Sequence, residues 1–223
     1  MHTSAFVLGK RFLEIYAKDA PGRILDVGSR DINGTLRPAA PQGFEYIGID
    51  LEAGKGVDMV LQDPYAYPFP GKHFDYVVST STFEHDQFFW LTFLECSRVL
   101  ADGGFLYINT PSNGSYHGYP HDFWRFYPDS SLALQDWARR MLQPITLVES
   151  FIGPQVESEW NDTVMIFTKA LAFTPKQYLS DEVAYAHNIH RGAEDVRNFR
   201  QHTQDQMVIA HFRQELQKAT GKA

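Results

Sequence analysis

Acidic residues and a glycine stand at the ends of two apolar runs near the start of the chain. Residues 23–27 (RILDV) form a short aliphatic run that ends at Gly28, and residues 46–49 (YIGI) form another that ends at Asp50. Both runs are typical of buried strands, and ligands of open α/β sheets bind outside the carboxyl ends of such strands. Asp50 follows Gly28 by about twenty residues, the spacing at which a carboxylate accepts hydrogen bonds from a ribose diol. The pattern predicts a nucleoside site.

The loop after the first strand discriminates between nucleoside ligands. A dinucleotide site favours G-x-G-x-x-G, whose backbone closes on a pyrophosphate. Residues 26–34 read DVGSRDING, so Asp26 and Asp31 would face the phosphates and bulky side chains replace the later glycines. The same carboxylates suit a ligand with a cationic amino-acid end, such as S-adenosylmethionine. A NAD-linked oxidoreductase is the weaker alternative because the phosphate loop is missing.

Further motifs follow in order up to residue 111. They are a third apolar segment ending at Asp63 (57–63, VDMVLQD), a turn and fourth strand (69–78, FPGKHFDYVV), a polar loop (79–86, STSTFEHD), and a glycine turn with a fifth strand (98–111, RVLADGGFLYINTP). The series resembles class I S-adenosylmethionine-dependent methyltransferases of the methyltransferase type 11-like kind. The resemblance implies an α/β, Rossmann-like fold: a seven-stranded, mostly parallel sheet with helices on both faces and an antiparallel last strand.

The resemblance also implies a cofactor and the residues that bind it. S-adenosyl-L-methionine would be the methyl donor and S-adenosyl-L-homocysteine the product, with Asp63 facing the adenine and the loop after the fourth strand flanking the methionine part. Two departures from the family pattern are the long first loop and Pro64, which has no backbone N–H to offer an adenine nitrogen. The implied cofactor-binding residues are Asp26, Gly28, Ser29, Gly34, Asp50, Leu51, Asp63, Pro64, Ser79 and Phe83.

Histidines supply the candidate bases. The resemblance places His85 near the sulfonium, where an imidazole that changes charge near neutral pH could remove a hydroxyl proton. His121 and Asp122 are the other catalytic candidates. Alternatively, His85 caps or packs the next helix. Methyl transfer needs little beyond alignment, since the sulfonium is already activated.

Residues 110–128 (TPSNGSYHGYPHDFWRFYP) form a long loop after the fifth strand, and loops of this length are usually functional. Its aromatic rings and charged groups suit a sugar ring or a flat acceptor. Its His-Asp-x-Trp-Arg-x-x-Pro pattern is similar to one in methyltransferases associated with bacterial surface-glycan synthesis, which implies a small-molecule or sugar hydroxyl as acceptor. The alternative is a lid that packs on the core, with Arg125 paired to Asp122 or Asp129. Candidate acceptor-binding residues are His117, Tyr119, Trp124, Arg125 and Tyr127, then Glu157, Glu159 and Trp160 in a later connection.

Residue types in the same loop raise the question of a metal ion. His117, His121 and Asp122 could together form an oxygen-rich site with histidine, which would suit magnesium or manganese. The two histidines need not converge, because the loop between them contains glycine and proline. A divalent metal is therefore compatible with the sequence but is not expected.

The elements that position these residues follow from apolar spacing. A segment with two prolines, residues 36–43, is a poor helix, so the first crossover should be short or a loop. The tail is more polar, yet Val183, Val196 and Phe199 and then Phe212 keep helical spacing. Its helices would cover the domain or mediate a homodimer. The remaining predictions are helices at 4–18, 88–100 and 129–142, and a closing antiparallel pair of strands at 145–152 and 163–170.

Composition limits the class of protein. The 223 residues, 43% of them hydrophobic, can bury one sizeable core, which predicts a leading helix (1–20), a cofactor-binding domain (21–172) with the lid 110–128, and a C-terminal helical extension (173–223). A single cysteine fits a reducing cytoplasm. A net charge of −7 without a basic cluster argues against nucleic acid as substrate, and no apolar run is long enough to span a bilayer. The leading hypothesis is a soluble, cytoplasmic enzyme, and the alternative is an inactive nucleoside-binding scaffold.

Overall fold

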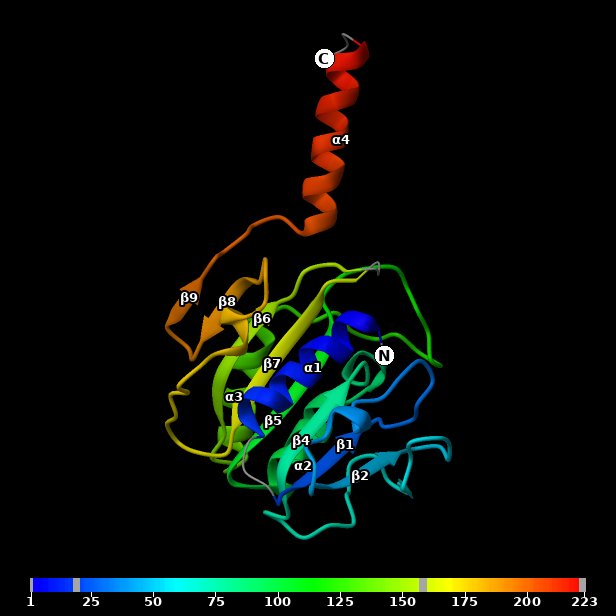
Figure 1. Cartoon of the computed structure of the whole chain (residues 1–223), viewed down its shortest axis with the longest axis vertical. Helices are drawn as coiled ribbons and strands as arrows, with labels where there is room; N and C mark the ends of the chain where they lie inside the picture. The colour runs from blue at the N-terminus through cyan, green and yellow to red at the C-terminus, as the bar shows by residue number, and fades with distance from the viewer. Residues whose placement is uncertain (1, 18–20, 157–159, 221–223) are drawn as a thin grey trace.

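A nine-stranded sheet with the order β3-β2-β1-β4-β5-β7-β6-β8-β9 runs through the protein. The structure is a computed structural model that describes residues 2–17, 21–156 and 160–220 (Figure 1). The strands are β1 (Arg23–Val27), β2 (Glu45–Asp50), β3 (Met59–Val60), β4 (Phe74–Thr80), β5 (Leu100–Pro111), β6 (Thr146–Ile152), β7 (Asp162–Thr168), β8 (His187–Arg191) and β9 (Asp195–Arg197).

Strand directions match the predicted α/β, Rossmann-like sheet. Neighbours are parallel from β3 through β5, β7 is antiparallel to both β5 and β6, and β8 is antiparallel to both β6 and β9. The fold class is confirmed, with nine strands in place of the seven predicted. Strand β3 is shorter than the predicted segment 57–63, because as an edge strand it pairs only with β2 and both of its residues are exposed.

Helices cover both faces of the sheet (Figure 1). On one face, Phe12 of α1 stacks on Tyr107 of β5 with ring centroids 4.8 Å apart. On the other, Phe93 of α2 packs on Phe167 of β7 at 4.9 Å. The sheet therefore separates two apolar clusters, one on each face, where the composition predicted one sizeable core. The helices are α1 (Thr3–Tyr16), α2 (Phe89–Val99) and α3 (Ser130–Arg140).

The first crossover contains only a short 3-10 helix, η1 (Arg37–Ala39), as the prolines predicted. Arg37 holds this connection in place. Its guanidinium lies over the Tyr46 ring, 4.7 Å from the centroid, donates to the carbonyls of Tyr46 and Gly56 at 3.1 and 3.2 Å, and pairs with Asp58. Loops thus replace crossover helices beside β1 and β2, and they leave the carboxyl edge of these strands open.

The segment 173–223 is only partly helical, which corrects the predicted C-terminal extension. A 3-10 helix, η3 (Leu179–Asp181), precedes β8 and β9, and only then does helix α4 (Gln204–Thr220) follow. The prediction was wrong for residues 187–197 because they pair with the free edge of β6, and such pairing overrides local spacing. None of the helices in the described ranges has both the length and the apolar character needed to cross a bilayer.

A buried carboxylate on β6 ties three parts of the chain together. The Glu149 side chain accepts hydrogen bonds from the backbone N–H groups of Leu179 and Ser180, at 2.6 and 3.1 Å, and from the hydroxyl of Tyr16 at 3.0 Å. Burial raises the pKa of Glu149 above its usual value. The C-terminal segment is therefore attached to both the sheet and α1.

Candidate active site at the carboxyl edge of the sheet

Gly28 turns the chain sharply at the end of β1. Its φ of +77° favours glycine, and a Cβ atom there would lie 2.0 Å from Oγ1 of Thr82 in the loop after β4. The Thr82 and Ser79 hydroxyls donate to the Val27 carbonyl at 3.2 and 3.0 Å. The ends of β1 and β4 are thus closely joined, and this contact needs the glycine that the motif supplied.

Asp50 is held at the end of β2, facing the loop that follows β1. Its Oδ2 accepts the N–H of Arg30 at 3.1 Å and its Oδ1 accepts the N–H of Leu51 at 2.7 Å. The N–H of Glu52 also donates to Oδ1, at 3.3 Å. A carboxylate has about four acceptor positions, so one position on Oδ2 is left for a hydrogen bond from a ligand. Leu51, 55% exposed, adds an apolar surface next to it. The pair offers a polar and an apolar contact to a nucleoside.

Asp26 is buried and accepts a hydrogen bond from the Tyr46 hydroxyl at 2.7 Å. Burial is the main cause that raises the pKa of Asp26 to about 6. Beside it, the buried Ser29 hydroxyl makes no hydrogen bond within the part of the chain that the structure describes. Buried polar atoms are rarely left without partners, so this hydroxyl is available to a bound group.

The other residues of the predicted cofactor set lie in different surroundings. The Gly34 N–H donates to Asp31 at 2.8 Å, and Asp63, exposed, accepts the N–H of Tyr65 at 2.8 Å. Pro64, next to it, is partly buried. Phe83 is completely buried in the core on the α2 side of the sheet. Phe83 is therefore a residue of the apolar core and is not exposed at the carboxyl edge of the sheet, where it was predicted to bind the cofactor.

An open cavity of about 930 Å³ lies between the start of α1 and the loops after β1 and β2, and Gly34 is the member of the predicted cofactor set that lines it. Its walls include His2, Phe6, Asn33, Arg37 and Asp58. On this side of the molecule, the ring of Trp160 stacks on that of His2 at 4.5 Å. Glu157 and Glu159, named with Trp160 from the sequence, lie outside the described residues.

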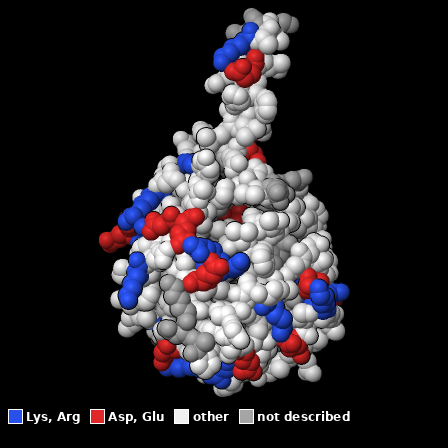
Figure 2. Space-filling model, viewed as in Figure 1, with Lys and Arg blue, Asp and Glu red and all other residues white. Residues whose placement is uncertain are grey.

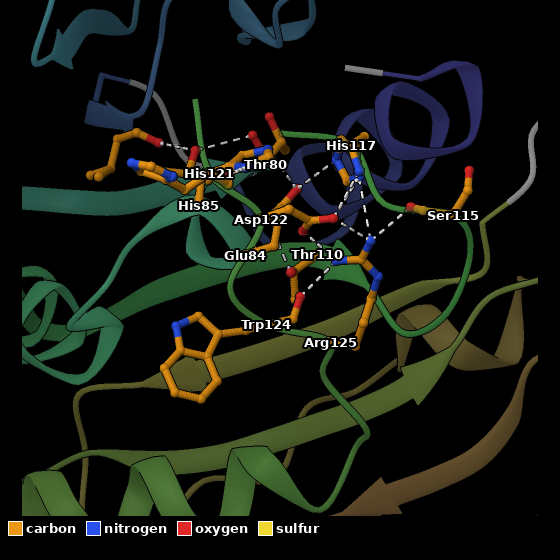
Figure 3. Close-up of polar contacts among 12 residues, drawn as sticks. Thr80, Glu84, His85, Thr110, Ser115, His117, His121, Asp122, Trp124 and Arg125 are labelled. Carbon is orange, nitrogen blue, oxygen red and sulfur yellow. Dashed lines mark hydrogen bonds and ion pairs between the residues drawn. The ribbon is translucent and has the colours of Figure 1, made fainter. Parts of the chain in front are cut away.

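Three metal-ligating or proton-transferring groups converge after β4. His85 Nε2 lies 3.7 Å from Glu84 Oε1, and His117 Nε2 lies 3.9 Å from the same oxygen (Figure 3). Glu84 is 0% exposed and its Oε1 makes no hydrogen bond with the described residues. Burial raises the pKa of Glu84 to about 8. The loop motif 79–86 contains Glu84, but only its neighbour His85 was predicted to take part in catalysis.

The lid 110–128 docks directly on this cluster. The N–H groups of Phe123 and Trp124 donate to the Glu84 carbonyl at 2.8 and 3.2 Å, and Thr110 donates to Glu84 Oε2 at 3.1 Å. His85 Nδ1 lies 2.5 Å from the carbonyl oxygen of His121. The His121 side chain is exposed, so its backbone and not its imidazole joins the cluster.

Arg125 organises the lid from within. It pairs with Asp122 at 2.5 and 2.6 Å, donates to the carbonyls of Asn113 and Ser115, and lies 3.5 Å from His117 Nδ1 (Figure 3). The hydrogen bonds from Arg125 are the main cause that lowers the pKa of Asp122 to about 2. Asp122 is therefore a weak base. The structure has the packed lid of the alternative interpretation, with Arg125 paired to Asp122.

The aromatic residues of the lid divide between packing and exposure. The Trp124 indole donates to the Asp86 carbonyl at 2.9 Å and packs against Phe89 with ring centroids 5.3 Å apart. Tyr119 and Tyr127 are exposed. The exposed rings remain available to an acceptor, whereas Trp124 mainly holds the lid on α2.

The chain is similar to known methyltransferase domains in sequence. Residues 3–160 match the sequence model of a family described as "Methyltransferase domain". No curated protein matches the chain significantly.

Solved structures with the same fold come from proteins of low identity. One is the 1,6-didemethyltoxoflavin-N1-methyltransferase of Burkholderia thailandensis with bound 1,6-didemethyltoxoflavin and S-adenosylhomocysteine (16% identity, 75% of this chain and 79% of that chain, TM-score 0.60). Another is a SAM-dependent methyltransferase from Methanosarcina mazei (14%, 69% and 95%, 0.51). The [4+2]-cyclase SpnF is also similar (14%, 75% and 81%, 0.57). At these identities the similarity shows the fold alone.

Proposed function

The chain belongs to the family of methyltransferase domains, and from this premise we propose that it moves a methyl group from S-adenosylmethionine to a hydroxyl oxygen of a small molecule or sugar. When bound, the cofactor supplies a methyl group already activated by the positive sulfur. The chain's own residues must bind the nucleoside, hold the acceptor and accept the hydroxyl proton.

The observation that carries this proposal is the position of Asp50. Its carboxylate is fixed by N–H groups from the loop after β1 and from its own turn, and it retains acceptor capacity toward the open edge. Leu51 would contact the adenine and the Ser29 hydroxyl would donate to the cofactor. The residues present therefore fit the nucleoside. Asp26, Gly28, Gly34, Asp63 and Ser79 would shape the rest of this site.

We assign proton removal to the Glu84, His85 and His117 cluster, in place of His121 or Asp122. With His85 Nδ1–H donating to the His121 carbonyl, its Nε2 carries the lone pair and is directed toward Glu84. Asp122, paired with Arg125, would orient His117 through contacts to its backbone N–H at 2.9 Å and to Nδ1 at 3.4 Å. The exposed rings of Tyr119 and Tyr127 would stack on the acceptor.

Calorimetric titration with S-adenosylmethionine, S-adenosylhomocysteine and NAD tests the proposal. We expect the two sulfur nucleosides to bind and NAD not to bind, because the first loop cannot enclose a pyrophosphate. Nucleotide sugars and other hydroxylated acceptors would then be screened for methyl uptake. Failure of both sulfur nucleosides to bind would favour the scaffold alternative.

We also propose that α4 joins two copies of the chain. Helix α4 projects from the rest of the protein (Figure 1). The part of α4 nearest the sheet shows few charged side chains (Figure 2). Its apolar residues keep helical spacing, and each is roughly half exposed or more: Met207, Val208, Ile209, Phe212 and Leu216. Isolated helices of this length are marginal in water, so packing against a second α4 would stabilise it.

Light scattering at micromolar concentration is expected to give the mass of a dimer. The Phe212→Asp variant should give a monomer, because a charge in the apolar interface cannot be solvated. The control is Gln217→Asp, which places the same charge on the opposite face of α4 and should leave the dimer intact. A wild-type monomer, or equal masses for both variants, would refute the dimer.

A further inference from the structure

We infer that Glu84, His85 and His117 bind a divalent transition-metal ion, with zinc the best match to the ligands. The cluster offers one carboxylate oxygen and two imidazole nitrogens that all lie within 4.8 Å of one another. The first two ligands come from the 3-10 helix η2 (Phe83–His85) after β4, and the third comes from the lid. The ion would therefore join the lid to the sheet.

Distances in the cluster fit a tetrahedral site after a small contraction. Zinc binds imidazole nitrogen and carboxylate oxygen at about 2.0–2.2 Å, so two ligands at a tetrahedral angle lie about 3.4 Å apart. The two Glu84 Oε1 to nitrogen distances are 3.7 and 3.9 Å. Movements of a few tenths of an ångström would bring each nitrogen to this distance from Glu84, and the two nitrogens, which lie within 4.8 Å of each other, would approach by at most about 1.4 Å. The three atoms are thus already arranged around a common point.

Each ligand is oriented by a second contact on the side away from that point. Metal-bound histidines commonly donate their other ring N–H to a carbonyl or carboxylate. Here His85 Nδ1 faces the His121 carbonyl at 2.5 Å, and His117 Nδ1 lies between the Arg125–Asp122 pair, 3.4 Å from Asp122 Oδ2 and 3.5 Å from Arg125 Nη2. Thr110 donates to the distal Glu84 oxygen at 3.1 Å. With these contacts in place, the three inner atoms lie within 4.8 Å of one another.

The buried oxygen of Glu84 is an independent sign of a missing ligand. The residue is 0% exposed, and Oε1 makes no hydrogen bond to anything in the described part of the chain. A buried carboxylate oxygen without a partner is costly. A cation at the common point would supply the partner, whereas a purely structural Glu–His network would be expected to close a hydrogen bond at this atom.

The ligand set selects the type of ion. Magnesium and calcium favour all-oxygen sites, while imidazole suits zinc, iron and other first-row ions. Two histidines and one glutamate are also the ligands of catalytic zinc sites, which keep a fourth position open. If the proposed function holds, an acceptor hydroxyl in that position of the metal-bound protein would lose its proton to water, because the imidazole nitrogens that serve as bases without the ion are then its ligands. Its oxygen would then bond the methyl carbon as the sulfur–methyl bond breaks and the sulfur becomes a neutral thioether.

Cobalt titration of chelator-treated protein, without cofactor, tests the site directly. Cobalt replaces zinc in tetrahedral sites and gives visible absorption whose intensity reports the geometry. We expect one ion per chain and intense tetrahedral bands, which zinc then abolishes by competition. The Glu84→Gln and His117→Ala variants should each weaken cobalt affinity about 100-fold or more, since even contacts behind the ligands are worth about 10–100-fold.

His121→Ala is the matched control. It removes a neighbouring imidazole but keeps the backbone carbonyl that faces His85, so its cobalt affinity should equal that of the wild type. Absence of a one-to-one complex in the wild type would overturn the proposal. So would equal affinity in the wild type and in either ligand variant. Circular dichroism checks folding, and Glu84→Gln decides if His117→Ala does not fold. Binding of S-adenosylhomocysteine is measured separately, so that failure of the proposed function can be distinguished from failure of the metal site.

Discussion

Replacing Asp50 with alanine is expected to weaken S-adenosylhomocysteine binding by about 10- to 100-fold, because the charge-assisted hydrogen bond that the remaining acceptor position would make with a ribose hydroxyl is lost. The substitution also releases the N–H groups of Arg30 and Leu51, which the carboxylate now holds. Asp50→Asn should retain part of the affinity, since an amide oxygen still accepts. Calorimetry on the purified variants measures each effect.

Glu52→Ala is the control for the Asp50 variants. Glu52 lies two residues away and forms an exposed ion pair with Arg30. Exposed pairs contribute little, so nucleoside affinity should change by no more than about twofold. If Asp50→Ala binds S-adenosylhomocysteine as well as Glu52→Ala does, Asp50 does not contact the ribose and the proposed site is wrong.

Replacing Glu149 with leucine is expected to cause the largest loss of stability. Leucine leaves the N–H groups of Leu179 and Ser180 without their acceptor, and the Tyr16 hydroxyl keeps only the Gln177 carbonyl at 3.4 Å. Stranded buried donors cost about 1–3 kcal/mol each, so the free energy of unfolding should fall by about 3–5 kcal/mol. For a chain of this size the melting temperature should fall by roughly 10 °C. Thermal and urea denaturation measure both quantities.

Asp102→Asn provides the surface comparison for Glu149→Leu. It breaks an exposed ion pair with Lys72 and should change the free energy of unfolding by less than about 1 kcal/mol. If the Glu149→Leu variant is as stable as the Asp102→Asn variant, the buried carboxylate does not anchor the C-terminal segment.

Glu149→Gln adds a pH dependence with a defined sign. Burial raises the pKa of Glu149 in the folded state, so the stability linked to its protonated form is complete below about pH 4.5 and is lost as the pH rises. Glutamine does not titrate. The stability advantage of the wild type over this variant should therefore shrink as the pH rises above about 4.5, and a growing advantage would contradict the raised pKa.

Local sequence patterns predicted the central part of the fold well. Buried strands such as β1 and β4 are apolar runs with glycine or polar residues at their ends, and α2 and α3 have regular amphipathic spacing. The prolines at 38 and 41 correctly indicated that the first crossover is not a full helix. These features depend on residues within one element, and for that reason the sequence alone sufficed.

Features that depend on distant contacts were not predictable in the same way. Residues 187–197 have apolar spacing compatible with a helix, but the free edge of β6 makes them strands. Glu84 did not stand out because nothing local shows that it is completely buried. Its convergence with His117 requires the lid to fold back over η2, and the intervening glycines and prolines do not determine that path.

The Glu149 contacts also bear on how the protein can be made. The carboxylate accepts from a helix at the start of the chain and from residues 179 and 180, so its environment is complete only when both segments are present. During translation, the hydrogen bonds from residues 179 and 180 that stabilise this buried carboxylate can form only after this late segment has been made. A gene fragment that stops at residue 172 would encode the methyltransferase motifs but leave this carboxylate without the N–H groups that hold it.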